Sequence, residues 1–338
     1  MLIRSLCTLT AFVGICLLAG CGGDTPAANP NSAAPGGATP AGSGKKRTIA
    51  VIPKSTSHEF WRSVGAGADQ AAKEFNAEIV FKAGEPGDDH AAQITLFDQM
   101  LGQADAIVLA PTHHQFLSQC VTKAKERKVP LVIIDSGVDA KPEDYVSYIA
   151  TNNKQGGIEC GRRMGKLLNG KGSVIMLKLV AGSESTTQRE DGFRETITKE
   201  FPGIKILQEK YGENKREDAI NNAGQLISAQ PEFDGVFACN ETTTYGMLKA
   251  LRERKLAGKV KFVGFDSAKE FIEAMENGEI DALAVQNPYK MGYEGVKAVC
   301  AALDGKTVEK MIDTGVVMVD KTNLKQPDIQ KLVNPPGK

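Results

Sequence analysis

Two aspartates stand at matching places in two similar stretches of the chain, about 130 residues apart. Lys125-Glu-Arg-Lys-Val leads into Leu-Val-Ile-Ile-Asp135, and Arg252-Glu-Arg-Lys-Leu leads into Phe-Val-Gly-Phe-Asp266. Each aspartate ends an apolar run typical of a buried parallel strand, and open parallel sheets bind ligands outside the carboxyl ends of their strands. Because carboxylates accept hydrogen bonds, the pair predicts a clamp on a small molecule rich in hydroxyls. Taken singly, either aspartate could instead only cap the next helix.

The same two carboxylates are the only candidates for an acid/base pair, which an exported carbohydrate-modifying enzyme would require. The sequence has no Gly-x-Gly-x-x-Gly after its first strand, no Walker lysine loop and no Gly-x-Ser-x-Gly. The histidine pair His113-His114 lacks carboxylates at metal-ligand spacing. We therefore expect a binding protein rather than an enzyme, without catalytic residues, cofactor or metal.

The body of the chain alternates between strands and helices. Short β-branched apolar runs predict strands, and apolar residues at helical spacing predict helices. Strands are expected at 48–53, 77–81, 106–110, 131–135, 173–178, 204–209 and 235–239, and helices after the first strand and at 91–101, 116–127, 154–168, 188–201 and 217–229. This alternation implies an α/β fold of parallel sheets with right-handed crossovers. With the internal repeat, it predicts two similar Rossmann-like lobes.

The N-terminus has the features of a secretory signal. A single Arg4 opens a short apolar stretch that ends in Leu18-Ala19-Gly20-Cys21, and this stretch is too short to span a bilayer. The last four residues resemble a bacterial lipobox, which implies that Cys21 receives a diacylglycerol and the chain is cut before it. The alternative is an ordinary signal peptide with an incidental cysteine. The segment from Gly22 to Gly44, rich in Gly, Ala, Pro and Ser, suits a flexible linker.

Composition narrows the class of protein further. The part after Lys45 is longer than one hydrophobic core usually spans, so two lobes are expected. Acidic and basic residues balance at 41 each, so no broad field attracts nucleic acid. The cysteines after Cys21 show no metal-binding spacing and are expected to be small buried residues, although an exported chain could pair them: Cys120, Cys160, Cys239 and Cys300.

From about Lys46 to Leu324 the chain resembles the periplasmic sugar-binding proteins of the ribose- and galactose-binding type. These type I periplasmic binding proteins are solute receptors of ABC importers and share their fold with the ligand domain of LacI-type repressors. The resemblance rests on short motifs in a fixed order. They are Lys54-Ser-Thr-Ser-His58-Glu-Phe60-Trp61, Ile-Ile-Asp135-Ser136, Ala150-Thr-Asn-Asn with Gly156-Gly157, Ser185-Thr-Thr-Gln-Arg189-Glu-Asp-Gly192-Phe193, Phe237-Ala-Cys-Asn240-Glu, Val263-Gly-Phe265-Asp266 and Val285-Gln286.

The resemblance implies a ligand site made of aromatic and polar side chains. Aromatic rings suit the apolar faces of a sugar, and charged or amide groups suit its rim of hydroxyls. Phe60 and Trp61 would stack on the ring, although either could simply belong to a core stripe. Asp135 and Asp266 would accept hydrogen bonds from hydroxyls. Arg189 would donate, unless it is only a solvated helix residue, and Asn240 and Gln286 would do both, although Asn240 could merely form a turn.

Four positions depart from the family pattern and make ribose doubtful. Ser136 stands where ribose binders carry an arginine, Lys54 occupies the first polar ligand position, and His58 replaces an asparagine. Asn214 also stands where relatives place an aromatic residue. A different pentose, a hexose, a sugar alcohol or a short acidic sugar therefore remain open, and Lys54 and His58 would tolerate negative charge on the ligand.

The resemblance also implies a domain plan and partners. The plan is a signal peptide at 1–20, a lipid-anchored linker at 21–45, a first lobe at 46–151 plus 287–314, a second lobe at 152–286 plus 315–325, and a tail at 326–338. Three crossings, near 150–152, 286–287 and 313–316, would form a hinge. We expect a monomeric lipoprotein of the cell envelope, in the periplasm or on the outer face of a membrane, that serves an ABC permease and ATPase. A chemosensory receptor for a membrane sensor kinase is the alternative.

Overall fold

The computed structural model describes residues 46–84 and 89–335. The expected signal peptide, the lipid anchor at Cys21 and the linker lie outside the described residues, as do the last three residues of the expected tail. Within the described ranges, no helix combines the length and the apolar character that crossing a bilayer requires.

The first six-stranded sheet has the strand order β11-β5-β4-β3-β1-β2, and all its strands are parallel. Its central strands are buried on both faces, as their continuous apolar runs predict. The strands are β1 (Arg47–Ile52), β2 (Ala77–Phe81), β3 (Ala106–Leu109), β4 (Leu131–Ile134), β5 (Ser147–Ala150) and β11 (Met311–Asp313).

The second sheet repeats this order as β12-β10-β9-β8-β6-β7. Its strands are β6 (Gly172–Lys178), β7 (Ile204–Tyr211), β8 (Gly235–Ala238), β9 (Lys261–Phe265), β10 (Ala282–Gln286) and β12 (Val316–Val319). β12 is antiparallel to β10, which differs from the expected all-parallel sheet. The reason is connectivity: β10 ends where the chain leaves this sheet and β12 begins where it returns, so Gln286 pairs with Val316.

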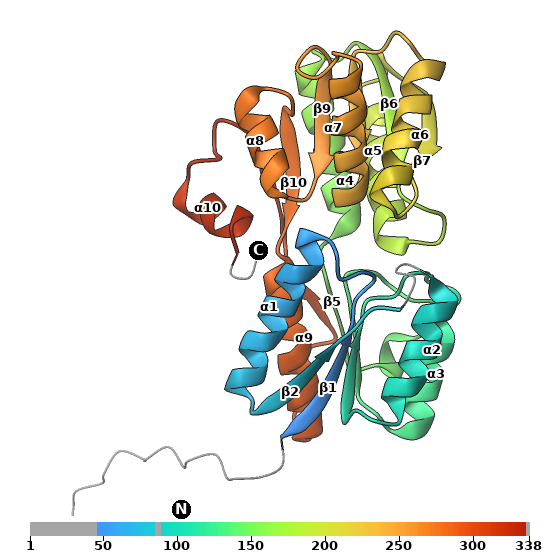
Figure 1. Ribbon diagram of the computed structural model, residues 1–338, viewed down its shortest axis with the longest axis vertical. Coiled ribbons are helices and arrows are strands. Elements are labelled where there is room, and N and C mark those ends of the chain that lie inside the picture. Colours follow the sequence, from blue (N-terminus) through green and yellow to red (C-terminus); the bar gives the residue numbers. More distant parts are fainter. Residues whose placement is uncertain (1–45, 85–88, 336–338) are drawn as a thin grey trace, which may run out of the picture. The chain divides into compact units, whose positions relative to one another are not determined.

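Helices cover both faces of each sheet (Figure 1). On the first sheet, α1 (Glu59–Glu74) and α9 (Pro288–Leu303) share one core, and α2 (His90–Leu101) and α3 (Ser118–Arg127) share another. On the second sheet, α4 (Asn153–Leu167) and α5 (Glu184–Glu200) cover one face. The other face carries α6 (Arg216–Ala229), α7 (Glu241–Glu253), α8 (Lys269–Asn277) and α10 (Pro327–Val333). We call the two sheets with their helices the first lobe and the second lobe.

The chain passes between the lobes three times. It does so between β5 and α4, between β10 and α9, and between β11 and β12. These are the places at which the sequence predicts a hinge. The fold expectation of two similar α/β lobes is confirmed.

Two elements differ from the sequence expectation. Helix α5 begins at Glu184, four residues before the expected start. The expected tail contains α10, whose Ile329 and Val333 are buried in the core of the second lobe, so that lobe extends beyond residue 325.

Candidate functional site

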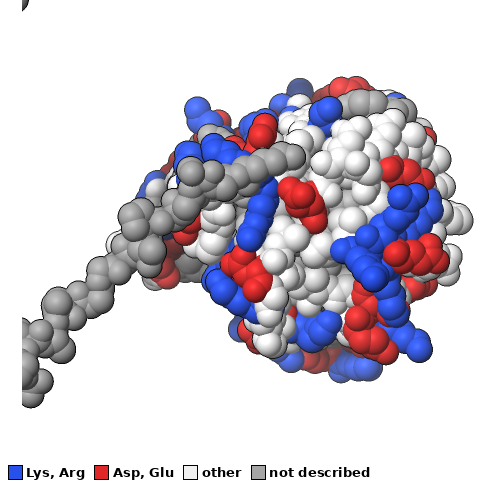
Figure 2. Space-filling model, turned by 90° about the horizontal axis from the view of Figure 1, so that it is seen from below, with Lys and Arg blue, Asp and Glu red and all other residues white. Residues whose placement is uncertain are grey.

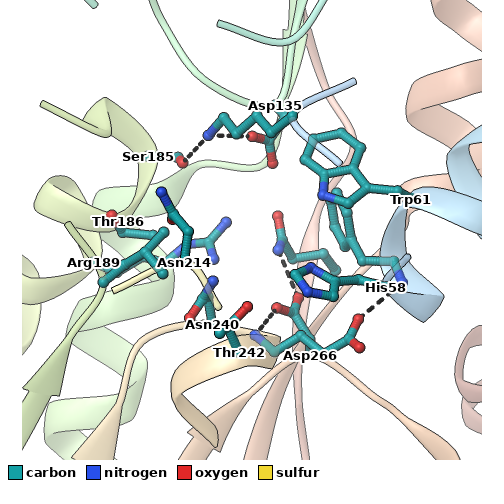
Figure 3. Close-up of a pocket in the computed structure, with 15 residues that line it drawn as sticks. His58, Trp61, Asp135, Ser185, Thr186, Arg189, Asn214, Asn240, Thr242 and Asp266 are labelled. Carbon is teal, nitrogen blue, oxygen red and sulfur yellow. Dashed lines mark hydrogen bonds and ion pairs between the residues drawn. The ribbon is translucent and has the colours of Figure 1, made fainter. Parts of the chain in front are cut away.

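A pocket of about 440 Å³, part of it open to solvent, lies where the carboxyl ends of strands from both lobes meet. Figure 3 shows the lining side chains pointing into a common space. The first lobe contributes Lys54, His58, Phe60, Trp61 and Asp135, and the second contributes Leu179, Ser185, Thr186, Arg189, Asn214, Asn240, Glu241, Thr242, Asp266 and, at the end of β10, Gln286.

The structure brings nine of the ten sequence-predicted ligand-binding residues to this pocket. The exception is Ser136, which is fully buried and is absent from the lining. Its hydroxyl oxygen lies 2.8 Å from Lys54 Nζ and from the hydroxyl of Ser185. Ser136 therefore lies behind the pocket wall and joins residues of both lobes.

The charge on Lys54 is balanced within the pocket wall. Its Nζ lies 2.8 Å from Asp135 Oδ2 and from Ser136 Oγ, and 3.4 Å from Ser185 Oγ of the second lobe. An ammonium group has three donors, so these three contacts account for its capacity. Because this charge is already paired, it gives no support to the expectation that Lys54 would tolerate negative charge on the ligand. Figure 3 shows the ion pair and the contact to Ser185 as dashed lines.

His58 adds no positive charge either. Burial lowers the pKa of its imidazole, and Arg216 and Arg62 lower it further, while Glu241 acts in the opposite direction. The neutral imidazole therefore predominates near pH 7, and it can donate one hydrogen bond and accept another.

Arg189 is buried rather than solvated, since only 2% of its surface is exposed. Its Nε donates to Asn153 Oδ1 at 2.8 Å and its Nη1 donates to the Cys239 carbonyl at 3.1 Å. The guanidinium also stacks on Phe265, with 4.0 Å between Cζ and the ring centroid. These contacts fix a planar cationic donor against the pocket.

Asp266 is held in a different environment from Asp135. Its Oδ2 accepts from the Glu241 backbone N–H and its Oδ1 accepts from Gln286 Nε2, both at 2.7 Å. Burial raises the pKa of this carboxyl to about 6, although Arg189 and the Gln286 hydrogen bond act against the rise. Among the described residues, Gln286 Oε1 is a buried acceptor without a hydrogen-bond partner. The wall thus keeps an acceptor that a hydroxyl donor would satisfy.

Asn240 serves the fold as well as the pocket. Its Oδ1 accepts from the Thr243 backbone N–H at 3.0 Å and from the Thr243 hydroxyl at 2.8 Å, which caps α7. The turn-forming role that the sequence left open is therefore present. Because Oδ1 is engaged, the Nδ2 donor is the group that can serve a ligand.

Phe60 and Trp61 form a T-shaped pair, with 4.8 Å between ring centroids and an interplanar angle of 84°. Trp61 is 6% exposed and belongs to the core of the first lobe, while Phe60 is half-buried beside that core. Both rings line the pocket. Trp61 therefore combines a core role with its place in the wall.

Several lining residues were not predicted from the sequence, although it contains signals for most of them. Ser185 and Thr186 lie on the first turn of α5, and a helix starting at 184 places Ser185 and Arg189 one turn apart. Glu241 and Thr242 directly follow Asn240, and Leu179 directly follows β6. Proximity to the carboxyl end of a strand was the usable signal in each case.

The four cysteines after Cys21 are buried free thiols. In the described ranges, no group of three or more His, Cys, Asp and Glu side chains is placed to hold a metal ion. His114, one of the pair noted in the sequence, contacts Asp139 at 2.8 Å on the surface of the first lobe.

Two similar α/β lobes with a polar pocket at the carboxyl ends of their strands define the two-lobed solute-binding proteins. The model of the periplasmic binding protein domain matches residues 49–307, and the chain belongs to this family. The resemblance to type I periplasmic sugar-binding proteins is confirmed, and the chain is a member of the sugar-binding, ABC-transporter branch of solute-binding proteins.

Three similar proteins illustrate the relationship. The ribose import binding protein of Salmonella typhimurium is 26% identical over 280 residues, which are 82% of this chain and 91% of that protein. A carbohydrate transporter solute binding protein from Agrobacterium radiobacter, in complex with D-arabinose, is 34% identical with a TM-score of 0.81, over 86% of this chain and 99% of that one. An ABC transporter solute binding protein from Agrobacterium vitis with bound D-fucose is 32% identical, with a TM-score of 0.81, over 85% and 100% of the two chains.

Proposed function

We propose that this chain is the substrate-binding lipoprotein of an ABC-type importer and binds a neutral monosaccharide or polyol by closure of its two lobes. The observation that carries the choice of ligand is the charge balance of the pocket. Lys54 pairs with Asp135, Arg216 pairs with Glu241 at 2.8 Å, and Arg189 acts on the buried carboxyl of Asp266. Counting Arg216, which pairs with Glu241 from outside the pocket lining, three cationic and three acidic groups leave no surplus charge for an ionic ligand to neutralise.

The remaining polar groups suit hydroxyls. Asp135, Asp266 and Gln286 offer acceptors, and Arg189 and Asn240 offer donors, while Phe60 and Trp61 supply ring surfaces. A hydrogen bond to a charged partner contributes about 1.5–3 kcal/mol, and a micromolar ligand needs only about 8 kcal/mol in total. Three such bonds and ring stacking therefore suffice for micromolar binding after the cost of closure.

The relatives support the same class of ligand. The proteins compared above bear the names or ligands ribose, D-arabinose and D-fucose, all of which are uncharged sugars. The uncharged Ser136 behind the wall, in place of the arginine of ribose binders, argues against ribose itself. A site that changes its polar groups rejects the former ligand because buried donors and acceptors lose their partners.

Binding would be coupled to transport through the three crossings between the lobes. The protein would exchange between an open and a closed arrangement of its lobes. Only ligand contacts that differ between these two forms can shift the equilibrium between them, and a ligand held by residues of both lobes makes such contacts. The closed form would then dock on a permease that an ATPase drives. Nucleic acid is not expected as a partner, since acidic and basic side chains are interspersed on the face shown in Figure 2 and the two kinds balance in the whole sequence.

The test of ligand class is a titration of Trp61 fluorescence, backed by calorimetry, with D-arabinose, D-fucose, D-ribose, xylitol and D-galacturonate. One neutral compound is expected to bind with a micromolar or lower Kd, and galacturonate at least tenfold more weakly. Galacturonate binding more tightly than every neutral compound would overturn the proposed ligand class. No binding by any compound would overturn the proposed function.

The lipid anchor at Cys21 needs a test of its own. Cells expressing the full chain are grown with an alkyne-tagged fatty acid, and the protein is expected to carry the label and to partition with membranes. Cys21→Ser is expected to lose both properties, while Cys16→Ser, which alters another cysteine of the leader, keeps them. A labelled Cys21→Ser protein would rule out this anchor.

A further inference from the structure

Helix α1 of the first lobe begins without a cap from its own lobe. Its N-cap residue, His58, is extended and its side chain makes no capping hydrogen bond. Instead, the backbone N–H groups of Glu59 and Phe60 donate to Glu241 Oε1 and Oε2, at 3.3 and 3.0 Å. Glu241 is the first residue of α7 in the second lobe. Its carboxylate therefore satisfies two N–H groups that have no acceptor within their helix and lies at the positive end of the helix dipole.

Helix α8 of the second lobe is capped in return by the first lobe. Its N-cap residue is Ala268, which has no side-chain acceptor. The backbone N–H of Lys269, the first residue of α8, donates to Glu59 Oε2 at 3.2 Å. Each lobe thus supplies one glutamate to a helix N-terminus of the other lobe.

The carboxylate of Glu241 is held ready by its own lobe. Only 3% of Glu241 is exposed, and its Oε1 pairs with Arg216 Nη2 at 2.8 Å. Arg216 in turn stacks on Tyr245, 4.4 Å from the ring centroid. The backbone N–H of Glu241 donates to Asp266 in the pocket. All these partners lie in the second lobe, so only the bonds to Glu59 and Phe60 depend on how the lobes are placed.

We propose that Glu59 and Glu241 form a closure latch, a pair of positioning residues that stabilise the closed form through contacts within the protein itself. The proposal rests on the proposed function, because it explains how ligand affinity is set. When the lobes separate, both cross-lobe caps are lost, whereas the bonds of Glu241 to Arg216 and Asp266 remain. The latch also holds the backbone of Phe60, one of the ring-stacking residues. The apparent affinity for a ligand scales with the fraction of protein in the binding-competent form, so a weaker latch lowers it.

The first test compares Glu59→Gln and Glu241→Gln in the full chain. The amide keeps the size of the side chain but removes its negative charge and replaces one acceptor oxygen with an N–H donor. This donor cannot accept a hydrogen bond from the helix N–H groups. Sugar release is followed by stopped-flow Trp61 fluorescence with the neutral compound of the panel that binds most tightly. Hydrogen bonds of this charge-assisted kind predict a dissociation rate about 10- to 100-fold higher in either variant. The association rate is expected to stay within a few-fold.

Glu59→Gln separates a latch from a direct ligand contact, because Glu59 is outside the pocket lining whereas Glu241 belongs to it. The matched control is Glu253→Gln, at the exposed end of α7, which is expected to release sugar at the unmodified rate. Faster release from both variants supports the latch. Faster release from Glu241→Gln alone would make Glu241 a ligand contact only, and unchanged release from both would also overturn the latch.

A second test needs no sugar, so it still decides the latch if the panel fails to bind. Spin labels are placed on exposed Gln103→Cys of the first lobe and Glu232→Cys of the second. The native cysteines of the body are buried, which keeps them unreactive. The double variant Glu59→Gln/Glu241→Gln is expected to change the interlobe distance distribution by losing its closed component. An identical distribution in the unmodified and double-variant proteins would refute the latch.

Discussion

Asp135 and Asp266 are held by the same backbone arrangement in the two lobes. Each follows a parallel strand, and its backbone N–H donates to a carbonyl of the neighbouring strand, Ile149 at 3.1 Å and Ala284 at 2.9 Å. Both have left-handed backbone angles, with φ of 63° and 71°, a region that aspartate tolerates better than most residues. The two lobes therefore share this backbone arrangement, while the partners of the two carboxylates differ.

The ion pair of Lys54 and Asp135 is buried, so removing one partner should be costly. Asp135→Asn is expected to leave an uncompensated ammonium and to lower the free energy of unfolding by about 3–5 kcal/mol. Ligand affinity is expected to fall at least tenfold because an acceptor is lost. Urea unfolding and fluorescence titration measure the two effects.

The control for Asp135→Asn is Asp98→Asn, which breaks an exposed pair with Lys123 of the same 2.7–2.8 Å length. Exposed pairs contribute about 0–1 kcal/mol, so this variant should be nearly neutral. The double variant Lys54→Met/Asp135→Asn removes both charges and is expected to recover part of the lost stability. A single variant as stable as the control would show that the pair is not buried in solution.

The raised pKa of Asp266 predicts a dependence of stability on pH. The carboxyl titrates near 3.8 in the unfolded chain and at about 6 in the folded one. The folded state therefore holds its proton more tightly, so the contribution to stability is complete below pH 3.8 and is lost as the pH rises to about 6. The difference corresponds to about 3 kcal/mol at most.

Unfolding of the unmodified protein and of Asp266→Asn between pH 4 and 7 measures this contribution. Burial raises the pKa of Glu190 to about 7, but Glu190 titrates in both proteins, so the difference between the two curves isolates Asp266. Ligand affinity should fall below pH 6, where Asp266 gains a proton and loses an acceptor. Parallel stability curves would contradict the pKa assignment.

Arg189→Lys is expected to weaken ligand binding although it keeps the charge. A lysine lacks the rigid fork whose separate nitrogens donate to Asn153 and to the Cys239 carbonyl, and it lacks the planar face that stacks on Phe265. We expect a Kd about 10- to 100-fold higher, measured by calorimetry. Arg162→Lys on α4, an exposed residue paired with Glu200, is the control and should bind as the unmodified protein does. Equal affinity in the two variants would place Arg189 outside the binding site.

The sequence predicted the fold well because its signals are local and repeated. Apolar β-branched runs specify strands that are buried on both faces, and the recurrence of Asp135 and Asp266 after such runs indicates two lobes. The pairing of side chains across the lobes could not be predicted in this way. The sequence predicts Lys54 only as a polar ligand position that would tolerate negative charge, and the three-dimensional structure shows Asp135, Ser136 and Ser185 around its ammonium group.

The same limit applies to contacts distant in sequence. Glu241 lies 181 positions from Phe60, and no local pattern connects a glutamate after β8 to the start of α1. The role of Asn240 could be predicted, by contrast, because its capping contact is local. The sequence already indicated a turn-forming role for Asn240 as an alternative to ligand binding. Local chemistry was therefore predictable, whereas the partners of the charged groups required the fold.

The C-terminal helix α10 is expected to contribute to the stability of the second lobe rather than to ligand binding directly. Ile329 is 4% exposed and packs in the main core of that lobe, although it lies beyond residues 49–307, which match the family model. Ile329→Ala should lower the free energy of unfolding by about 2–4 kcal/mol through lost burial and the cavity left behind. Asp328→Ala, one residue earlier on the exposed side of α10, should change the free energy of unfolding by less than about 0.5 kcal/mol.

Because Ile329 does not line the pocket, the Kd for the ligand should stay within about twofold in both variants at temperatures where they are folded. Urea unfolding with calorimetric titration checks both expectations, and equal stability of the two variants would show that α10 is not docked on the lobe.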